Sequence, residues 1–204
     1  MSETSIEARS ARERWNRRYT ERGFVPFPDR PAEWLVENRA VLTGPGGRRA
    51  LDLACGDGRN ALFLAQLGFD VVAVDVSDVA INALRKAAVN RGLAVDARRV
   101  DLEDEALPGD RYDVIVQINY LQRDLFGSLA RALTSGGILI VETVTRAHVE
   151  ELGKSFDPRF VLEHNELLRS FPDLHLRHYR EGVVDRSGRP RAVASLLAER
   201  RLAR

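Results

Sequence analysis

The sequence has 204 residues, which suits one domain with a core that needs neither disulfides nor a structural metal. Its 31 Lys and Arg nearly balance 30 Asp and Glu, so a formal charge of +1 provides no single-sign field to hold a nucleic acid. A single cysteine, Cys55, excludes an internal disulfide and a cysteine-rich metal site. The polar start and the lack of an apolar run of about 20 residues argue against a signal peptide and a membrane span. We therefore expect a cytoplasmic monomer or homodimer that binds neither nucleic acid nor membrane.

Residues 1–45 differ in composition from the remainder of the chain. A charged segment at 7–22 is followed by a proline-rich stretch at 24–31 and a helix-like stretch at 32–42. We expect these residues to form an N-terminal helical cap or lid over the ligand-binding edge of a sheet. Residues 46–204 are then the cofactor-binding domain.

From residue 50 onward, short apolar runs alternate with segments of helical period, a pattern typical of βα units around a parallel sheet. Ser77 is a predicted N-cap of the second helix of this series. Two final strand-like stretches flank a Gly/Pro turn at 185–190, which predicts an antiparallel hairpin. The predicted fold is α/β: a Rossmann-like, doubly wound, mostly parallel seven-stranded sheet with a C-terminal antiparallel hairpin. Its expected strands are 50–54, 70–75, 94–100, 112–119, 138–144, 174–184 and 191–199, and its expected helices include 60–67, 78–91 and 125–133.

The turn after the first of these strands has the composition of a ligand loop. Gly56 and Gly58 permit a close backbone approach, and the helix that follows presents free amide groups to a polar or anionic ligand. Asp52, at the end of the strand, is placed to accept from a ligand ammonium group. The spacing G-x-G-x-x-A also satisfies a loose dinucleotide fingerprint, and a tight βα turn needs glycine for its own sake. The glycines therefore locate a ligand edge without naming the ligand.

Two further acids follow the next two strands. Asp75 lies about twenty residues beyond the glycines, where a carboxylate binds both hydroxyls of a ribose. Asp101 follows the third strand, where a carboxylate can accept from an adenine amine. Its neighbours Glu103 and Asp104 have the alternative of a solvated acidic turn. The pattern indicates an adenosine-type ligand.

These residues together resemble the class I S-adenosylmethionine-dependent methyltransferases. Asp52-x-x-x-Gly56-x-Gly58 is similar to the family's first motif, Asp75 to its ribose acid and Asp101-Leu102 to its adenine-contacting segment. Residues 135–137, Ser-Gly-Gly, resemble the turn before its fifth strand. Segments 15–19, 55–60, 166–168 and 179–182 are similar to tellurite-resistance and, more loosely, thiopurine-type methyltransferases. The resemblance implies S-adenosyl-L-methionine as cofactor, S-adenosyl-L-homocysteine as product and a small-molecule methyl acceptor. The expected cofactor contacts are Arg18, Tyr19, Asp52, Ala54, Gly56, Gly58, Asn60, Asp75, Val76, Asp101, Leu102 and Gln117.

The acceptor is expected beyond the carboxyl ends of the strands, near 117–123, 143–148 and the cap. The candidates for acceptor contact or catalysis are Asn119, Tyr120, Arg123 and His148. Tyr120 has the alternative of a core aromatic. Trp15, four residues before Tyr19, is expected to pack onto the sheet, with closure over the sulfonium methyl as its alternative role. The four histidines lack the spacing of metal ligands, so we expect no metal site. No Asp–His or Glu–His pair is evident as a base, which favours an already ionised acceptor such as a thiolate or a selenium or tellurium oxyanion.

Three other functions compete with this interpretation. A nicotinamide-dependent oxidoreductase would use the same glycines and Asp75, and a non-catalytic module would keep the cofactor site without an acceptor pocket. Methylation of a nucleic-acid base is disfavoured because the fourth strand ends in Ile118-Asn119-Tyr120-Leu121 and lacks the Asn-Pro-Pro-aromatic element that such enzymes share.

Overall fold

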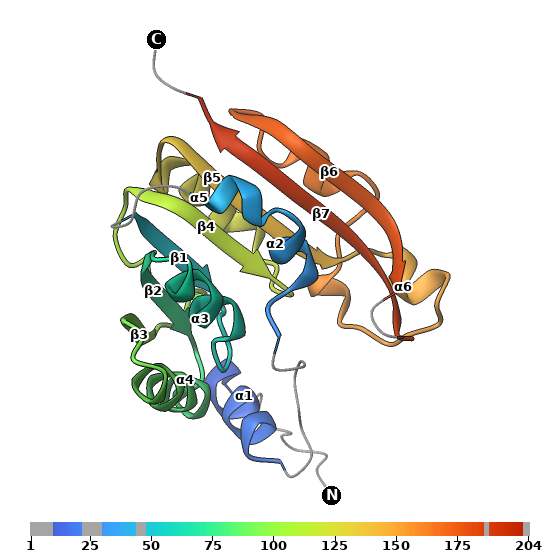
Figure 1. Ribbon diagram of the computed structural model, residues 1–204. Helices are drawn as coiled ribbons and strands as arrows, with labels where there is room; N and C mark the ends of the chain where they lie inside the picture. Colours follow the sequence, from blue (N-terminus) through green and yellow to red (C-terminus); the bar gives the residue numbers. More distant parts are fainter. Residues whose placement is uncertain (1–9, 22–29, 44–47, 186–187, 202–204) are drawn as a thin grey trace, which may run out of the picture.

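Seven strands form a single sheet in the computed structural model, which describes residues 10–21, 30–43, 48–185 and 188–201 (Figure 1). The strand order is β3-β2-β1-β4-β5-β7-β6, with β7 antiparallel to both β5 and β6 and the other pairs parallel. The predicted Rossmann-like sheet with its C-terminal hairpin is confirmed. Its strands are β1 Arg49–Leu53, β2 Asp70–Asp75, β3 Val95–Arg99, β4 Tyr112–Ile118, β5 Leu133–Val144, β6 Leu174–Asp185 and β7 Pro190–Arg200.

The chain runs outward from β1 through β2 to β3, and then returns to the other side of β1 to form β4 and β5 (Figure 1). This reversal lies between β1 and β4, and the carboxyl ends of the strands at such a reversal are the place where open α/β sheets bind ligands. The helices that connect or cover the strands are α1 Ala11–Thr20, α2 Glu33–Glu37, α3 Arg59–Gln66, α4 Asp78–Asn90, α5 Phe126–Ala132, α6 Ala147–Glu150 and α7 Glu166–Arg169. Short 3-10 helices are η1 Arg39–Leu42, η2 Arg123–Leu125 and η3 Pro158–Phe160.

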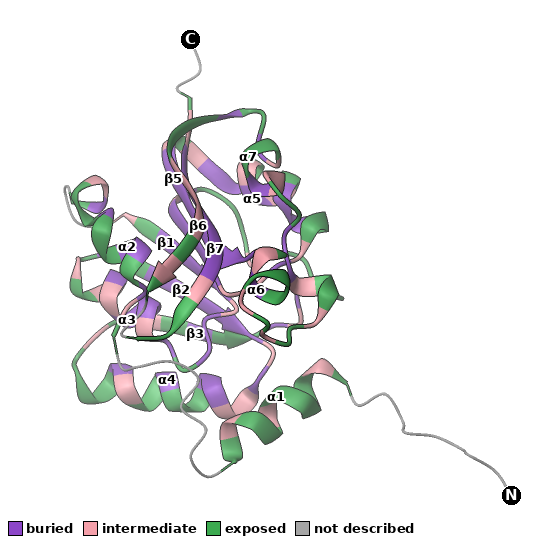
Figure 2. Cartoon of the chain, turned by 90° about the vertical axis from the view of Figure 1, so that its right-hand side faces the viewer, coloured by how far each residue is buried: buried purple, intermediate pink, exposed green. Residues whose placement is uncertain are grey.

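The core lies on both faces of the sheet, as the continuous apolar runs of its strands require. Successive residues of β4 alternate between the two layers: Ile115 packs with α5 and α7, whereas Val114 and Val116 pack with α2, α3 and α4. In Figure 2 the buried residues accordingly follow the strands and the inner faces of the helices. The predicted N-cap of α4 is confirmed, because Ser77 Oγ accepts from the Ala80 amide at 3.2 Å.

Strand β5 starts five residues before the expected position and includes the Ser-Gly-Gly segment that the sequence suggests is a turn. Gly136 has φ +78°, and a Cβ on Gly137 would lie 2.9 Å from the carbonyl oxygen of Thr134. The pairing with β4 shifts register between Tyr112 and Val114. The glycines therefore bend the strand within the sheet instead of ending it.

The N-terminal elements are of two kinds. In α2 and η1, Trp34, Leu35 and Leu42 are buried in the core, and Trp34 Nε1 donates to the carbonyl oxygen of Leu196. Helix α1 has no buried residue and contacts α4. A boundary at residue 45 thus separates the polar helix α1 from the sheet, but it also separates α2, which packs in the core, from that sheet. Most of the proline-rich stretch lies outside the described residues.

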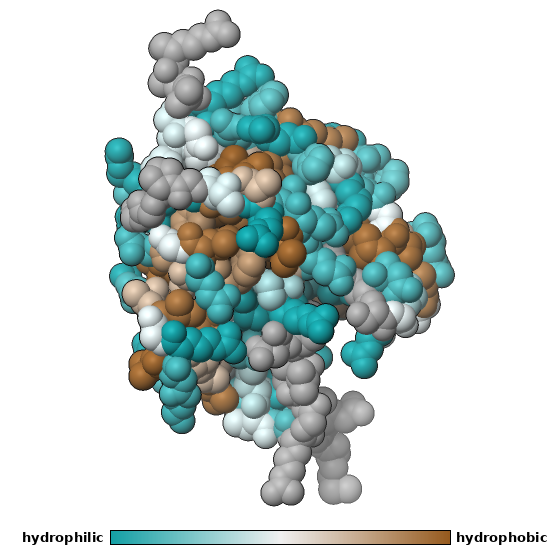
Figure 3. All heavy atoms as spheres, viewed as in Figure 1, coloured by the Kyte–Doolittle hydropathy of each residue, from teal (hydrophilic) through white to brown (hydrophobic). Residues whose placement is uncertain are grey.

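On the face shown in Figure 3, apolar atoms occur in patches between hydrophilic ones. Among the described residues, no helix has the length and apolar character that crossing a bilayer would require.

Candidate functional site

The loop between β1 and α3 is held in shape by its own backbone. The Cys55 amide donates to the Val74 carbonyl at 2.9 Å, and the Gly58 amide donates to the Cys55 carbonyl at 3.0 Å. Gly56 and Gly58 have φ of +58° and +93°, and Ala54 also lies in the left-handed region at +49°. The loop therefore leads directly into the amino end of α3, where unpaired amides favour polar or anionic groups.

Asp75 ties this loop to the end of β2. One carboxylate oxygen accepts from the Gly56 amide at 2.9 Å and the other from the Ser77 amide at 2.8 Å. Burial raises the pKa of Asp75, and these two backbone donors oppose that rise. A carboxylate has about four acceptor positions, so Asp75 retains capacity for a ligand diol while it shapes the loop. Val76 lies between Asp75 and Ser77, which are joined by the hydrogen bond from the Ser77 amide.

Asp52 lies at the end of β1 with 1% of its surface exposed. Among the described residues its Oδ2 atom has no hydrogen-bond partner. Burial raises the pKa of Asp52 to about 7, with smaller opposing effects from the Arg59 charge and the Ala61 amide. A buried acceptor with a raised pKa is suited to a cationic ligand group, which would restore the ionised form.

The adjacent strand β4 ends in two more unpaired acceptors. Gln117 is fully buried; its Nε2 donates to the Tyr120 carbonyl at 3.0 Å, while its Oε1 has no partner among the described residues. The buried Oδ1 atom of Asn119 also has no partner among the described residues. Asn119 has φ +59°, and its backbone amide donates to the Glu142 carbonyl.

Tyr120 connects β4 to the predicted adenine segment. Its hydroxyl donates to Gln122 Oε1 at 2.5 Å, and Gln122 Nε2 donates to the Leu102 carbonyl at 2.8 Å. Burial raises the pKa of Tyr120, with further contributions from Glu103, Asp101 and Asp75. The charges of those acids therefore reach the phenol. Asp101 itself forms a local turn, since its Oδ1 accepts from the Glu103 amide at 3.2 Å.

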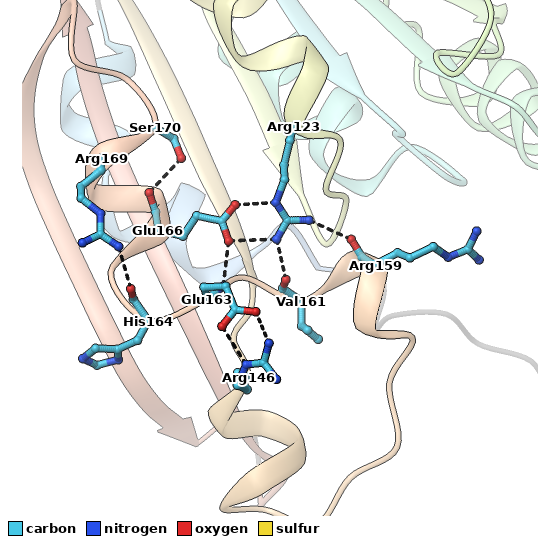
Figure 4. Close-up of polar contacts among 9 residues, drawn as sticks. All are labelled: Arg123, Arg146, Arg159, Val161, Glu163, His164, Glu166, Arg169 and Ser170. Carbon is cyan, nitrogen blue, oxygen red and sulfur yellow. Dashed lines mark hydrogen bonds and ion pairs between the residues drawn. The ribbon is translucent and has the colours of Figure 1, made fainter.

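Arg123 is committed to holding the chain after β5 (Figure 4). Its guanidinium forms a two-point ion pair with Glu166, at 2.5 and 2.9 Å, and donates to the carbonyl oxygens of Arg159 and Val161. Nearby, Arg146 pairs with Glu163. The two arginines follow β4 and β5, so they fasten segment 157–166 beside the carboxyl ends of both strands.

His148 is 6% exposed and lies in α6. Its Nδ1 accepts from the Ala192 amide at 3.3 Å. Burial lowers the pKa of His148, and the charges of Arg191 and Lys154 lower it further. A neutral imidazole that accepts at Nδ1 carries its proton on Nε2, so the ring is arranged as a donor at Nε2.

Helix α1 brings Tyr19 to the loop between β1 and α3, residues 54–58, which we call the cofactor loop. A Cβ built on Gly56 would lie 2.5 Å from the Tyr19 hydroxyl oxygen, which shows how closely the phenol covers this glycine. Trp15 and Tyr19 have ring centroids 6.1 Å apart, and the Arg18 guanidinium lies 5.4 Å from the Trp15 centroid. Asn60 is another residue that the sequence predicts as a cofactor contact. Its side-chain oxygen accepts from the Ala32 amide at 2.9 Å and so joins α3 to the chain before α2.

Sequence reasoning missed the roles of two residues. Asn16 docks α1 on the start of α4 through contacts with Ser77, Asp78 and Val79, and its place in segment 15–19, one turn before Tyr19, was the available signal. Glu142 is a 3% exposed carboxylate on β5 that accepts from Ser195 Oγ at 2.8 Å and from Arg180 at 3.3 Å. A carboxylate next to the apolar residues 138–141 was the available signal for Glu142.

The opposite edge of the sheet has a different character. A polar hollow of about 330 Å³ lies at the amino ends of β4 and β5, lined in part by Asp113, Ser135, Arg177 and Glu199. Asp113 accepts from Thr134 there, and Arg177 pairs with Glu199. These paired groups, on the edge away from the glycine loop, do not form the candidate site. Within the described ranges, no group of three or more His, Cys, Asp or Glu side chains could hold a metal ion.

The residues at the carboxyl edge fit a nucleoside that carries a cationic group. Acceptors on Asp52, Gln117 and Asn119 that find no partner within the described part of the chain require donors, which an ammonium group supplies. Asp75 keeps acceptor capacity for ribose hydroxyls.

Comparison with known proteins agrees with this geometry. Residues 50–137 match a family model described as "Methyltransferase domain". A protein named "Ubiquinone biosynthesis O-methyltransferase" from Cereibacter sphaeroides is 33% identical over 105 residues, which cover 49% of this chain and 42% of the relative. The chain thus spans half or less of the length of such curated relatives.

Two solved structures share the fold. "Crystal Structure of TehB from Haemophilus influenzae" superposes with a TM-score of 0.70 and 21% identity, covering 83% of this chain and 62% of that one. The structure described as "Conversion of a Disulfide Bond into a Thioacetal Group during Echinomycin Biosynthesis" has a TM-score of 0.68 and 20% identity, covering 95% and 93%. Residues 50–137 thus match a methyltransferase domain, and the strand order is that of a Rossmann-like sheet which these two structures share.

Proposed function

We propose that this protein is an S-adenosyl-L-methionine-dependent methyltransferase that acts on a small molecule. The observation that carries the proposal is the buried, unpaired carboxylate oxygen of Asp52 beside a glycine loop anchored by Asp75, within a matched methyltransferase domain. The cofactor, when bound, supplies an electrophilic methyl group on a sulfonium sulfur. The same match favours this function over nicotinamide-dependent oxidation.

Each group at the edge has a separate task. Asp52 holds the ammonium group, and the amide oxygens of Gln117 and Asn119 are further acceptors at the end of the adjacent strand. Asp75 binds the ribose hydroxyls, and Tyr120, through Gln122, aligns the Leu102 segment for the adenine. Tyr19 covers Gly56 and limits the access of water to the loop.

The acceptor lies between the loop after β4 and segment 157–166. The Arg123–Glu166 and Arg146–Glu163 pairs hold that segment in place (Figure 4), so Arg123 acts as a positioning residue. Displacement at a methyl group needs the nucleophile in line and close, and a fixed, water-poor pocket supplies much of the rate through orientation.

We propose a soft, already ionised acceptor: a thiolate, or an oxyanion of selenium or tellurium. The lone pair of His148 Nδ1 is occupied by the Ala192 amide and its Nε2 carries the proton, and the raised pKa of Tyr120 keeps its phenol protonated, so neither is poised to remove a proton near pH 7. A hydroxyl acceptor is the second candidate, because the curated relatives are named as O-methyltransferases.

The test is the initial rate of S-adenosyl-L-homocysteine formation against pH for thiol, tellurite, selenite, phenol and amine acceptors. We expect a thiol or oxyanion to react fastest, with a pH profile that is unchanged in His148→Gln because this ring provides no base. A phenol or amine that reacts fastest through a pKa lost in His148→Gln would replace this proposal with general-base catalysis. Binding of the cofactor without turnover of any acceptor would favour the non-catalytic module.

The raised pKa of Asp52 predicts proton release when cofactor binds. Near pH 7 the carboxyl group is partly protonated, since its pKa is about 7. A bound ammonium group favours the carboxylate, so binding at pH 7 should release about half a proton. Titration calorimetry of S-adenosyl-L-homocysteine in buffers of different ionisation enthalpy measures this release. It should disappear in Asp52→Asn, and an equal release in the variant would contradict the assignment.

The same shift predicts a stability change in the ligand-free protein. The folded pKa exceeds the model-peptide value of 3.8, so the folded state binds more protons and loses stability as pH rises from about 4 to about 7. Asp52→Asn should therefore raise the Tm of the ligand-free protein at pH 8 more than at pH 5, while it weakens cofactor binding. Scanning calorimetry at the two pH values would show this, and a loss of Tm at pH 8 would contradict it.

A further inference from the structure

Helix α1 is docked on the sheet domain by polar contacts. It begins with a capping box between Ser10 and Glu13 and has no buried residue, in contrast to the apolar packing of α2. Arg12, Asn16 and Tyr19 share one face because they are four and three residues apart. This face meets the start of α4 and the cofactor loop.

Asn16 makes three hydrogen bonds on that face. Its Oδ1 accepts from Ser77 Oγ at 2.7 Å and from the Val79 amide at 3.3 Å, and its Nδ2 donates to Asp78 Oδ2 at 3.2 Å. Arg12 supports it by pairing with the same Asp78 oxygen at 2.6 Å. An exposed ion pair of this kind contributes little, so docking depends chiefly on Asn16.

The turn that Asn16 holds also carries the proposed ribose acid. The Ser77 amide donates to Asp75, whose other oxygen accepts from the Gly56 amide. Gly56 is in turn covered by Tyr19, one turn further along α1. Helix α1 therefore contacts the loop between β1 and α3 through Tyr19 and the turn after β2 through Asn16, and Asp75 links this loop to this turn.

We propose that Asn16 is a positioning residue that couples docking of α1 to occupation of the cofactor site. This inference rests on the proposed function. A cofactor that contacts Tyr19 and the Asp75 turn binds more tightly to the docked state, and by linkage it stabilises that state by the same factor. If loss of Asn16 leaves α1 docked in only a fraction of molecules, the apparent affinity falls to that fraction of its value in the docked state.

The experiment compares the full-length wild type with Asn16→Ala and the matched control Arg17→Ala, whose exposed side chain lies on the same helix outside the docking face. Calorimetry gives the Kd of S-adenosyl-L-homocysteine, and hydrogen exchange gives the protection of amides in residues 11–20 with and without this ligand. We expect Asn16→Ala to raise Kd about tenfold, the loss of one or two hydrogen bonds, and to reduce the protection of α1. Arg17→Ala should change neither, and both proteins should keep the wild-type Tm within a few degrees.

A rescue variant distinguishes positioning from general damage. The double exchange Asn16→Asp with Asp78→Asn keeps an acceptor for Ser77 and a donor across the contact, so it should recover most of the affinity and the protection. Unchanged Kd and protection in Asn16→Ala would overturn the coupling, as would a raised Kd with α1 still fully protected or a double exchange that recovers nothing. Failure of the wild type itself to bind would instead refute the proposed function.

Discussion

Asp75→Ala is expected to weaken binding of S-adenosyl-L-homocysteine about 30- to 1,000-fold. Two hydrogen bonds from ribose hydroxyls to a carboxylate are lost, and with partial recovery by water this is roughly 2–4 kcal/mol. The structure adds a second effect, since the carboxylate also accepts from the Gly56 and Ser77 amides. Alanine leaves both donors unpaired in a buried place, so the free energy of unfolding should fall by about 2 kcal/mol or more. Titration calorimetry and thermal unfolding measure the two effects.

Asp75→Asn separates the effect on cofactor affinity from the effect on stability. Its side-chain oxygen can still accept from one of the two amides, and the loop should keep more of its stability than in Asp75→Ala, whereas the loss of charge still weakens the ribose contacts. We therefore expect Asn to restore Tm more than it restores affinity. Wild-type affinity in Asp75→Ala would contradict the ribose assignment, and wild-type Tm would contradict the anchoring role.

Gly58→Ala is expected to lower the free energy of unfolding by about 2–6 kcal/mol. Gly58 has φ +93°, a conformation that costs a non-glycine residue about 1–3 kcal/mol. An added Cβ would also overlap the side chain of Leu84, which is fully buried in the core, and such overpacking costs about 1–3 kcal/mol more. For a chain of this length, where Tm shifts by about 2–4 °C per kcal/mol, Tm should fall by about 4–24 °C.

Gly68→Ala is the matched control. Gly68 has a similar φ of +86°, but a Cβ there would meet nothing within 4 Å. This variant should therefore show only the conformational cost of about 1–2 kcal/mol. A larger loss for Gly58→Ala than for Gly68→Ala measures the overlap with Leu84; equal losses would show that Leu84 moves aside without cost.

The periodicity and turn chemistry of the sequence determined the sheet domain. Apolar runs separated by helical segments predict β1, β2 and β4 within a residue at each end, and Ser77 before a helical pattern predicts the N-cap that the structure shows. These features depend on neighbours in the chain. The carboxyl ends of parallel strands lie at one edge of a sheet, so the sequence alone predicts that Asp52 and Asp75 lie at the same edge.

The start of β5 depended on tertiary structure. Ser135-Gly136-Gly137 has the composition of a turn, but pairing of Leu133 with Tyr112 on β4 extends the strand through it. Only the neighbouring strand supplies that partner, so local composition predicts the break and the sheet overrides it.

The partners of the polar side chains were also decided by the fold. Arg123 meets Glu166, His148 meets the Ala192 amide, and Asn16 meets Ser77, over separations of 43, 44 and 61 residues. Each side chain can bind many groups, and its own neighbourhood in the sequence does not select among them. The order of the strands brings the chosen partner within reach. The sequence by itself thus predicted which residues stand at the carboxyl edge of the sheet, while tertiary structure decided which partners they meet, which of them fasten segment 157–166 and which hold α1 in place.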